Sequence, residues 1–227
     1  MARKRRGDPV HGWLVIDKSP NITSAKVVNQ ARKILNAAKV GHSGTLDPMA
    51  TGVLPLAFGE ATKTVSYMMD GRKEYLFTVC WGEARDTDDA EGKIIETSDQ
   101  RPDRAEIEAA LPEFTGEIDQ IPPAYSAIKV DGERAYKLAR QEKPLELKSR
   151  KIFIERFELI DCPDPAHATF EVTSGKGAYI RGLARDLARR LGTVGHISSL
   201  RRTRVGPFKE NDAISLAKLE ELGHKGA

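Results

Sequence analysis

The sequence has little of what marks secreted, membrane-bound or zinc-binding proteins. Its 227 residues include two cysteines, Cys80 and Cys162, and no Cys-x-x-Cys pair. This usage favours free, partly buried thiols in a reducing compartment over a disulfide or a structural zinc site. The apolar run Trp13–Ile16 is too short for a membrane span or for the core of a signal peptide. We therefore expect a soluble protein of the cytoplasm.

The motifs of several common enzyme classes are also missing. Gly41–Gly44 places its second glycine one residue too early for the G-x-S-x-G nucleophile elbow of hydrolases. Ser174–Gly177 lacks the spacing of a nucleotide-binding P-loop. The five histidines form no pair at metal-ligand spacing. The acidic run Asp86–Glu91 has Ala90 where a calcium loop needs a ligand. These patterns predict neither nucleotide nor metal chemistry.

Charge is segregated along the chain, although the net charge is only +3. Basic residues concentrate in Arg3–Arg6, Lys143–Arg156 and Lys176–Arg204, whereas acidic residues gather in Arg85–Glu91 and over 99–108. Such segregation is typical of a face that binds a polyanion. A solvated surface of mixed charge is the alternative that the pattern leaves open.

Helix-like and strand-like segments alternate irregularly. The clearest helix is Tyr179–Leu191, where an apolar stripe runs beside Arg181, Arg185 and Arg189. Thr23 or Ser24 is expected to cap an earlier helix. The absence of a steady βαβ rhythm favours an α+β fold with a mixed, largely antiparallel sheet flanked by helices. Strands are expected at 12–17, 75–81 (buried on both faces), 151–157 and 168–174, and helices at about 24–35, 60–69, 105–111, 134–141 and 179–191.

We expect one domain over residues 1–227, because no internal repeat or linker interrupts the chain. The proline-rich middle, which is loop-rich over 118–130 and has a turn signal at Asp131–Gly132, is interpreted as an excursion from that domain.

The stretch Gly41–Gly52 holds three glycines, a histidine and one aspartate, Asp47. Pro48 follows the aspartate, so Asp47 fits the N-cap of a helix with Pro48 at its first position. Alternatively, the glycines let the backbone approach a substrate, and Asp47 is a nucleophile with His42 nearby. The local pattern leaves both interpretations open.

Lys39–Pro55 (KVGHSGTLDPMATGVLP) resembles the signature of the TruB family of RNA pseudouridine synthases. Further matches follow in the same order as in the family: Trp13–Lys18 (before the signature), Ala84–Gly92, Gln120–Gly132, Lys176–Arg181 and Leu200–Phe208. The resemblance implies a pseudouridine synthase fold and the isomerisation of uridine to pseudouridine at position 55, in the T-loop of tRNA. That chemistry needs no redox step, nucleotide or metal, so no cofactor is expected.

The resemblance also assigns roles to residues. Asp47 is the implied nucleophile, and Tyr75 resembles the tyrosine that stacks on the flipped base and is a candidate for proton abstraction. Arg181 resembles the arginine paired with the catalytic aspartate, which would keep Asp47 ionised. From the residues alone, Arg181 is one more member of a basic helix face. Leu200 resembles the apolar residue that completes the uracil pocket, and its local alternative is a core position.

Contacts to RNA are implied as well. His42 resembles the histidine that fills the space left when the target uridine is extruded, a step that costs on the order of a few kcal/mol. Its local alternative is a turn histidine. Phosphate contacts would position the RNA and be sensitive to salt. The expected RNA-binding set comprises Lys18, His42, Tyr179, Leu200 and Arg202, together with Arg3–Arg6 and an insertion over about 122–150.

The chain departs from the family in two places. Lys18–Asn21 replaces the usual Lys-Pro-x-Gly, and Asn21 tolerates a left-handed backbone well enough to stand in for glycine. Lys18 would support the active-site loop from this turn. Many bacterial relatives continue into a small C-terminal RNA-contacting domain, whereas this chain stops after Ser215–Leu222. We therefore expect a naturally short or a truncated form that keeps its activity, because every catalytic candidate lies upstream, and that binds RNA more weakly.

Two other functions remain open. One is the guide-RNA-directed branch of the same family, which modifies ribosomal RNA within a protein complex. The other is a non-catalytic chaperone that helps tRNA to fold. The leading interpretation is a monomeric tRNA pseudouridine synthase whose partner is the T-arm of tRNA, without a membrane or metal partner.

Overall fold

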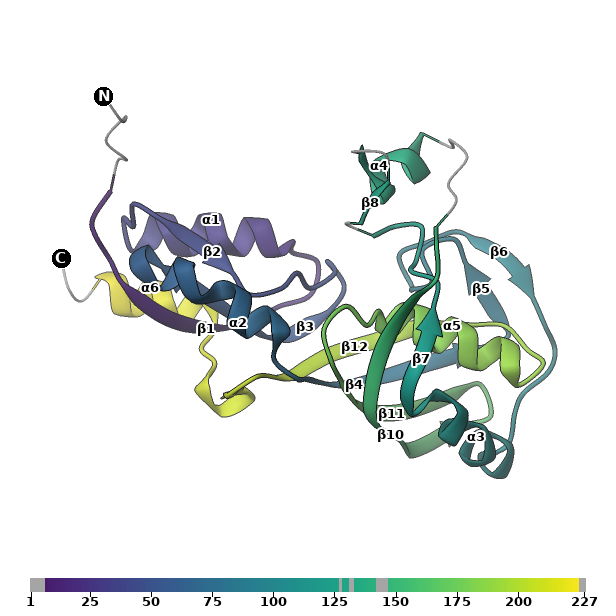
Figure 1. Cartoon of the computed structure of the whole chain (residues 1–227). Helices are drawn as coiled ribbons and strands as arrows, with labels where there is room; N and C mark the ends of the chain where they lie inside the picture. The colour runs from purple at the N-terminus through teal and green to yellow at the C-terminus, as the bar shows by residue number, and fades with distance from the viewer. Residues whose placement is uncertain (1–6, 127, 131–132, 142–146, 225–227) are drawn as a thin grey trace. The chain divides into compact units, whose positions relative to one another are not determined.

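The computed structural model describes residues 7–126, 128–130, 133–141 and 147–224 (Figure 1). They form two compact units: unit 1 comprises Met1–Tyr75 and Leu200–Ala227, and unit 2 comprises Leu76–Ser199. The chain crosses from one unit to the other within strands β4 (Lys73–Trp81) and β12 (Gly195–Val205). The single domain expected from the sequence stays a prediction. The expected basic segment Arg3–Arg6 lies outside the described residues.

Unit 1 is built on a mixed sheet. In it β3 pairs antiparallel with β1 and β2, while β12 runs parallel to β3 with Arg202 opposite Gly52. Burial is nearly complete along β3, where Val53 to Phe58 are all buried. Its strands are β1 (Gly12–Lys18), β2 (Val40–His42), β3 (Thr51–Phe58), β13 (Phe208–Lys209) and the C-terminal part of β12.

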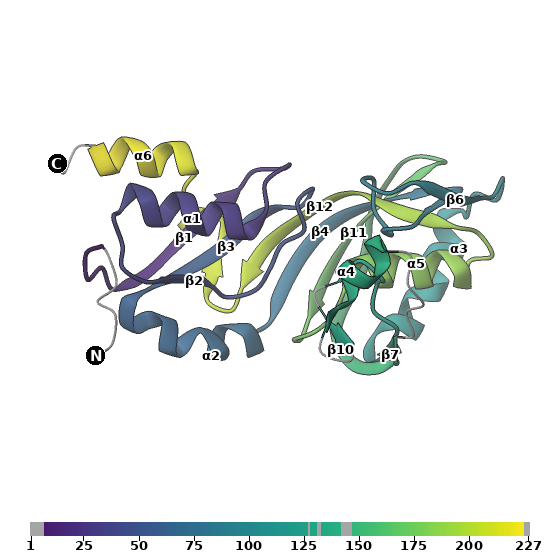
Figure 2. The same cartoon turned by 90° about the horizontal axis from the view of Figure 1, so that it is seen from above.

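Helix α1 of unit 1 buries one face, which carries Val27 and Ala31. Thr23 caps α1 by accepting a hydrogen bond from the Lys26 amide at 3.2 Å, as the sequence predicted. Helices α1 and α6 lie side by side in Figures 1 and 2. The predicted helix over 60–69 begins as a 3₁₀ turn and becomes α-helical only at Val65. The helical segments are α1 (Ser24–Ile34), η1 (Gly59–Thr64), α2 (Val65–Asp70), η3 (Glu210–Asp212) and α6 (Leu216–His224).

Unit 2 has an antiparallel sheet whose core is aromatic. The strand order is β4–β11–β10–β7, and the long β10 pairs with both β11 and β7. Phe170 packs with Phe77 and Phe157, each at 5.4 Å between ring centroids, and meets the edge of Trp81 at 6.3 Å. The other strands are β5 (Glu83–Arg85), β6 (Ile94–Thr97), β7 (Gly116–Gln120), β8 (Lys129–Val130), β9 (Glu133–Arg134), β10 (Arg150–Asp164) and β11 (His167–Ser174).

The clearest helix of the sequence is confirmed as α5 (Ile180–Arg190), whose Leu183 and Leu187 are buried. A shorter helix, α3 (Arg104–Ala110), begins with a capping box between Asp103 and Glu106. The remaining helical segments are η2 (Leu111–Phe114) and α4 (Ala135–Arg140), the latter inside the expected insertion.

Three expectations about strands are corrected. Strand β4 is not buried on both faces, because Leu76 is 38% exposed while Phe77 is 1% exposed. Residues 116–120 form β7, although the segment from 118 was expected to be loop. Strand β12 was not predicted at all, because its many arginines conceal the alternation of a strand. Both cysteines are free, as predicted. Among the described residues no helix is long and apolar enough to cross a membrane.

Candidate active site

Asp47 lies in the loop between β2 and β3 of unit 1. Its carbonyl accepts a hydrogen bond from the Ala50 amide at 3.1 Å, which closes a tight turn, and β3 begins at Thr51. The interpretation of Asp47 as a helix N-cap is therefore wrong, since a strand follows it. Asp47 is a partly exposed residue.

Lys18 anchors this loop from the end of β1. Its side chain is 1% exposed, and Nζ donates to the carbonyls of Ser19 (3.0 Å), Ile22 (2.8 Å) and Pro48 (2.9 Å). The last bond ties the carbonyl directly after the candidate nucleophile to the turn after β1, which is the supporting role expected of this lysine. Asn21 has φ +61°, so it does stand in for glycine in that turn.

Ser24 is a second anchor, which the sequence analysis treated only as a candidate helix cap. Its Oγ donates to the Leu46 carbonyl at 3.0 Å and accepts from the Leu46 amide at 2.9 Å. Both groups are buried, so these bonds are shielded from water. Helix α1 thereby fixes the residue immediately before Asp47.

Arg202 is the third anchor. Its Nε donates to the Val53 carbonyl at 2.8 Å and its Nη2 to the Gly44 carbonyl at 3.2 Å. Burial lowers the pKa of its guanidinium, while the hydrogen bond to the Tyr75 side chain and the charge of Asp47 act in the opposite direction. One buried cation therefore contacts the loop at two points and lies within electrostatic range of the two catalytic candidates of unit 1.

His42 and the apolar residues complete this part of the site. The Nδ1 atom of His42 accepts a hydrogen bond from the Gly44 amide at 3.2 Å, so Nδ1 carries no proton. Burial and the nearby charge of Arg202 lower the pKa of His42, which favours a neutral imidazole. Tyr75 is 8% exposed and Leu200 6% exposed, so both are buried, and their place in a uracil pocket stays a prediction.

Arg181 belongs to unit 2, where it begins α5. Its guanidinium donates to the carbonyls of Thr87 (2.7 Å) and Tyr125 (2.9 Å), and Nε lies 3.6 Å from the carboxylate of Asp89. Both side chains of this ion pair are 4% exposed. Arg181 therefore joins the acidic loop to the start of the expected RNA-binding insertion.

A second ion pair runs beside the first. Arg185, one turn along α5, pairs with Asp88 at 3.1 Å and also donates to the Ile121 carbonyl at 2.7 Å. Burial raises the pKa of Asp88, and the charge of Arg185 opposes that shift. Asp88 has φ +60°, a left-handed conformation held by these contacts. The acidic run, considered above as a calcium loop, is thus a partner of the basic helix.

Tyr179 precedes α5 and is held by Gln120, a residue that was noted only as the start of a matching motif. The Gln120 amide donates to the Tyr179 carbonyl at 3.0 Å and accepts from the Tyr179 amide at 2.9 Å. The guanidinium of Arg150 lies 5.3 Å from the centre of the Tyr179 ring. An aromatic ring beside a cation is a suitable surface for nucleic-acid bases and phosphates.

The predicted site residues therefore fall into two groups. Unit 1 contains Lys18, His42, Asp47, Tyr75, Leu200 and Arg202, and unit 2 contains Tyr179 and Arg181. The pairing of Arg181 with Asp47 stays a prediction, as do the roles of all eight residues. A direct RNA contact by Lys18 or Arg202 also stays a prediction, and their 1% exposure gives it no support.

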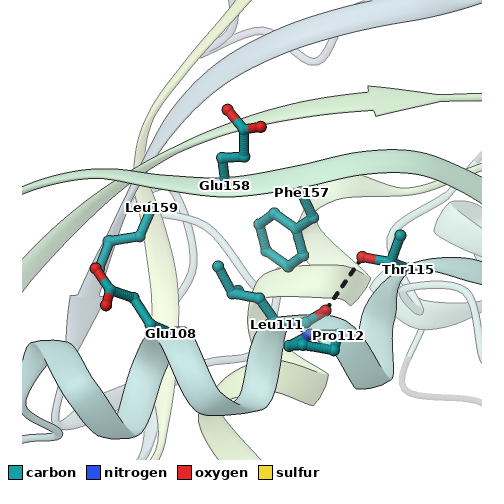
Figure 3. Close-up of a pocket in the computed structure, with 7 residues that line it drawn as sticks. All are labelled: Glu108, Leu111, Pro112, Thr115, Phe157, Glu158 and Leu159. Atoms are coloured by element: carbon teal, nitrogen blue, oxygen red, sulfur yellow. Dashed lines mark hydrogen bonds between the residues drawn. The ribbon is translucent and has the colours of Figure 1, made fainter.

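A separate pocket of about 670 Å³ in unit 2 contains none of these residues. Figure 3 shows it between η2 and β10, where the side chains of Leu111 and Phe157 face each other and Glu158 points to the other side of the strand. The lining residues include two glutamates, Glu108 and Glu158, and negative charge disfavours a phosphate ligand. Among the described residues no cluster of three or more His, Cys, Asp or Glu side chains is arranged to hold a metal ion.

Two family models cover most of the chain. The model described as "TruB family pseudouridylate synthase (N terminal domain)" matches residues 32–180, and that described as "tRNA pseudouridylate synthase B C-terminal domain" matches residues 181–225. The expectation that a C-terminal RNA-contacting domain is missing stays a prediction.

Curated relatives and solved structures agree with these models. The chain is 61% identical to tRNA pseudouridine synthase B of Rhodospirillum rubrum over 99% of its length and 73% of the relative's. It is 59% identical to the protein of that name from Gluconacetobacter diazotrophicus, covering 96% of this chain and 71% of the relative.

Among solved structures, the chain resembles one in a Cbf5-Nop10-Gar1 complex with a TM-score of 0.73 and 33% identity over 93% of its length. It spans 54% of that chain. A chain of an H/ACA RNP bound to a substrate RNA containing 2'-deoxyuridine gives a TM-score of 0.71 at 28% identity, with 100% of this chain and 62% of that chain covered. The predicted fold, family and enzyme class are thereby confirmed, and the chain belongs to the TruB family of pseudouridylate synthases.

Proposed function

We propose that this chain isomerises the uridine at position 55, in the T-loop of tRNA, to pseudouridine, with Asp47 as the nucleophile. The observation that carries the proposal is that the loop around Asp47 is fixed by hydrogen bonds from three elements. Lys18, Ser24 and Arg202 each bind the backbone on one side or the other of Asp47 through buried groups. A loop fixed from three elements holds a carboxylate in one geometry, which is what a nucleophile needs.

The isomerisation neither adds atoms to the uridine nor removes any from it. The bond between N1 of uracil and C1′ of ribose breaks with the assistance of the Asp47 carboxylate, and a bond between C5 and C1′ forms. The proton on C5 is lost to a base, for which Tyr75 is the candidate, and N1 regains a proton. No second reactant supplies or accepts electrons, so the isomerisation needs no redox cofactor.

Electrostatics supports the role of Asp47. An opposite charge nearby favours the ionised form of a carboxyl group. Arg202 provides such a charge within unit 1, and we propose Arg181 as the second one.

Base flipping follows from the substrate, because a uridine inside a folded loop must leave its stack before it can react. We propose that the extruded base lies between Tyr75 and Leu200, both buried, and that neutral His42 occupies the space it leaves. Tyr179 and Arg150 would contact the RNA outside the pocket. We propose a cytoplasmic monomer, since one chain carries the whole predicted set of site residues.

Release of tritium from tRNA labelled at uridine C5 tests the proposal. The protein should release tritium, and Asp47→Asn should release none above background, because an amide cannot act as the nucleophile. Asp99→Asn, which changes an exposed aspartate, is the matched control and should behave as wild type. Equal release by wild type and Asp47→Asn would overturn the assignment.

The likeness to Cbf5 and H/ACA RNP chains favours one second candidate, a guide-RNA-directed synthase. The same assay separates the two, because a tRNA synthase acts on free tRNA without guide RNA or protein partners. Activity only after such additions would favour the second candidate. Restored tRNA folding by Asp47→Asn without tritium release would show a chaperone activity beside catalysis.

A further inference from the structure

Arg202 is an unusual residue for a tRNA-binding protein, because its positive charge is hidden. The side chain is 1% exposed and is among the largest fully buried side chains of the described residues. Burying a guanidinium costs several kcal/mol unless partners replace its water. A residue that contacts RNA phosphates gains nothing from such burial, so the charge must act inside the protein.

The partners of Arg202 identify what it acts on. Its Nε and Nη2 bind the carbonyls of Val53 and Gly44, which lie on either side of Asp47 in sequence. Tyr75 and the charge of Asp47 also act electrostatically on the guanidinium, in the direction opposite to burial. One guanidinium therefore contacts both flanks of the loop that carries Asp47.

Backbone packing makes this arrangement specific. Gly52 pairs with Arg202 across the parallel strands and has φ +98°. A Cβ atom on Gly52 would lie 2.2 Å from the Arg202 carbonyl, so only glycine fits there. A Cβ atom on Gly44 would lie 3.7 Å from Nη1 of Arg202. The glycine-rich loop is thus closely packed around this one residue.

We propose that Arg202 is a positioning residue of the pseudouridine synthase reaction, which holds the Asp47 loop in one fixed geometry. This inference rests on the proposed function and extends it. The planar guanidinium donates in two fixed directions at once, toward the carbonyls of Val53 and Gly44. A lysine ammonium is a compact charge without that fork, so lysine cannot replace it.

The test separates positioning from RNA binding. Arg202→Lys and Arg202→Met are compared with wild type for the single-turnover rate of tritium release and for tRNA affinity at two salt concentrations. Both variants should lose roughly 10²-fold in rate, the effect of displacing a reacting group by about 1 Å. Their tRNA affinity and its salt dependence should match wild type. Weaker binding with a smaller salt slope and a normal single-turnover rate would show a phosphate contact and overturn the proposal.

Arg201→Gln is the matched control from the same strand. Arg201 is about one-third exposed and pairs with Asp17 and Glu210 at the surface. The Arg201→Gln variant should therefore release tritium at a rate near that of wild type. If Arg202→Met does not fold, Arg202→Lys still tests the proposal, because it keeps the charge and most of the buried chain. A wild-type rate for Arg202→Lys would overturn the requirement for a guanidinium.

Hydrogen exchange provides a measurement that does not depend on activity. The amides of Leu46 and Ala50 bond to Ser24 and to the Asp47 carbonyl within the loop. They should exchange faster in Arg202→Lys than in wild type, whereas Arg201→Gln should leave them unchanged. Unchanged exchange in Arg202→Lys would overturn the proposal. Absence of tritium release from the wild type, with the exchange difference present, would instead overturn the proposed function.

Discussion

Replacing Lys18 by methionine should destabilise the protein and slow catalysis together. Methionine fills most of the space of the lysine chain but cannot donate to the carbonyls of Ser19, Ile22 and Pro48. Ser19 is an exposed residue, so its carbonyl can recover a water molecule, whereas those of Ile22 and Pro48 lie in partly buried surroundings.

The size of the effect follows from these bonds. Each buried carbonyl left without a donor costs about 1–3 kcal/mol. Two such groups would cost about 2–6 kcal/mol, and because both carbonyls lie in partly buried surroundings that water can reach, we expect the free energy of unfolding to fall by the lower part of that range, about 2–4 kcal/mol. For a chain of this size that change lowers Tm by roughly 5–15 °C. The released Pro48 carbonyl also loosens the loop at Asp47, so the single-turnover rate should fall at least about tenfold.

Thermal unfolding and tritium release measure the two effects. Lys26→Met is the matched control, because Lys26 is exposed on α1, and its unfolding free energy should change by less than about 0.5 kcal/mol. Lys18→Met and Lys26→Met with equal Tm and equal rate would refute the view that Lys18 anchors the loop.

Three further predictions concern single groups. Burial lowers the pKa of His196 below its ordinary 6.5, so the unfolded chain binds more protons than the folded one. The free energy of unfolding should therefore fall as pH decreases through 6.5, and chemical denaturation of His196→Gln should show a smaller fall over the same pH range. Gly52→Ala should cost roughly 2–6 kcal/mol in denaturant unfolding, whereas Gly41→Ala, with no atom within 4 Å of its new methyl group, should be nearly neutral. Asp103→Ala should cost about 1 kcal/mol, seen by urea unfolding, because it removes a helix cap.

The sequence predicted correctly those features that depend only on residues close together in the chain. The Thr23 cap, the left-handed Asn21 and the apolar stripe of α5 each depend on neighbouring residues, and all three are present. Strand β12 was missed because an arginine such as Arg202 is expected at the surface. Its burial and its partners become evident only in the tertiary structure. Burial of a charged side chain depends on contacts made by distant parts of the chain, which a sequence pattern does not contain.

The candidate site shows the same division. The resemblance to the family selected Asp47, Tyr75 and Arg181 as catalytic residues. Two residues that hold site residues in place were missed or interpreted differently. Ser24, which fixes the residue before Asp47, was considered as a helix cap, and Gln120, which holds Tyr179, was named only as the start of a matching motif. Each role arises from a pair of hydrogen bonds, across 22 residues of sequence for Ser24 and 59 for Gln120. Only the fold brings such pairs together.

The acidic run 86–91 illustrates the limit of reading charge from sequence. In sequence it is a negative patch apart from the basic helix. In the structure Asp88 and Asp89 pair with Arg185 and Arg181 of α5, so the two charged segments neutralise each other locally. The distribution of surface charge that RNA would meet therefore differs from the one that the order of charges in the sequence suggests.

The central claim is that Asp47 converts the T-loop uridine. The most direct measurement is to map pseudouridine along tRNA by carbodiimide modification and primer extension, after reaction with the wild-type protein or with Asp47→Asn. We predict a single new stop at position 55 with the wild type and none with Asp47→Asn, although both bind the tRNA. A stop at another position, or the same stop with Asp47→Asn, would contradict the account.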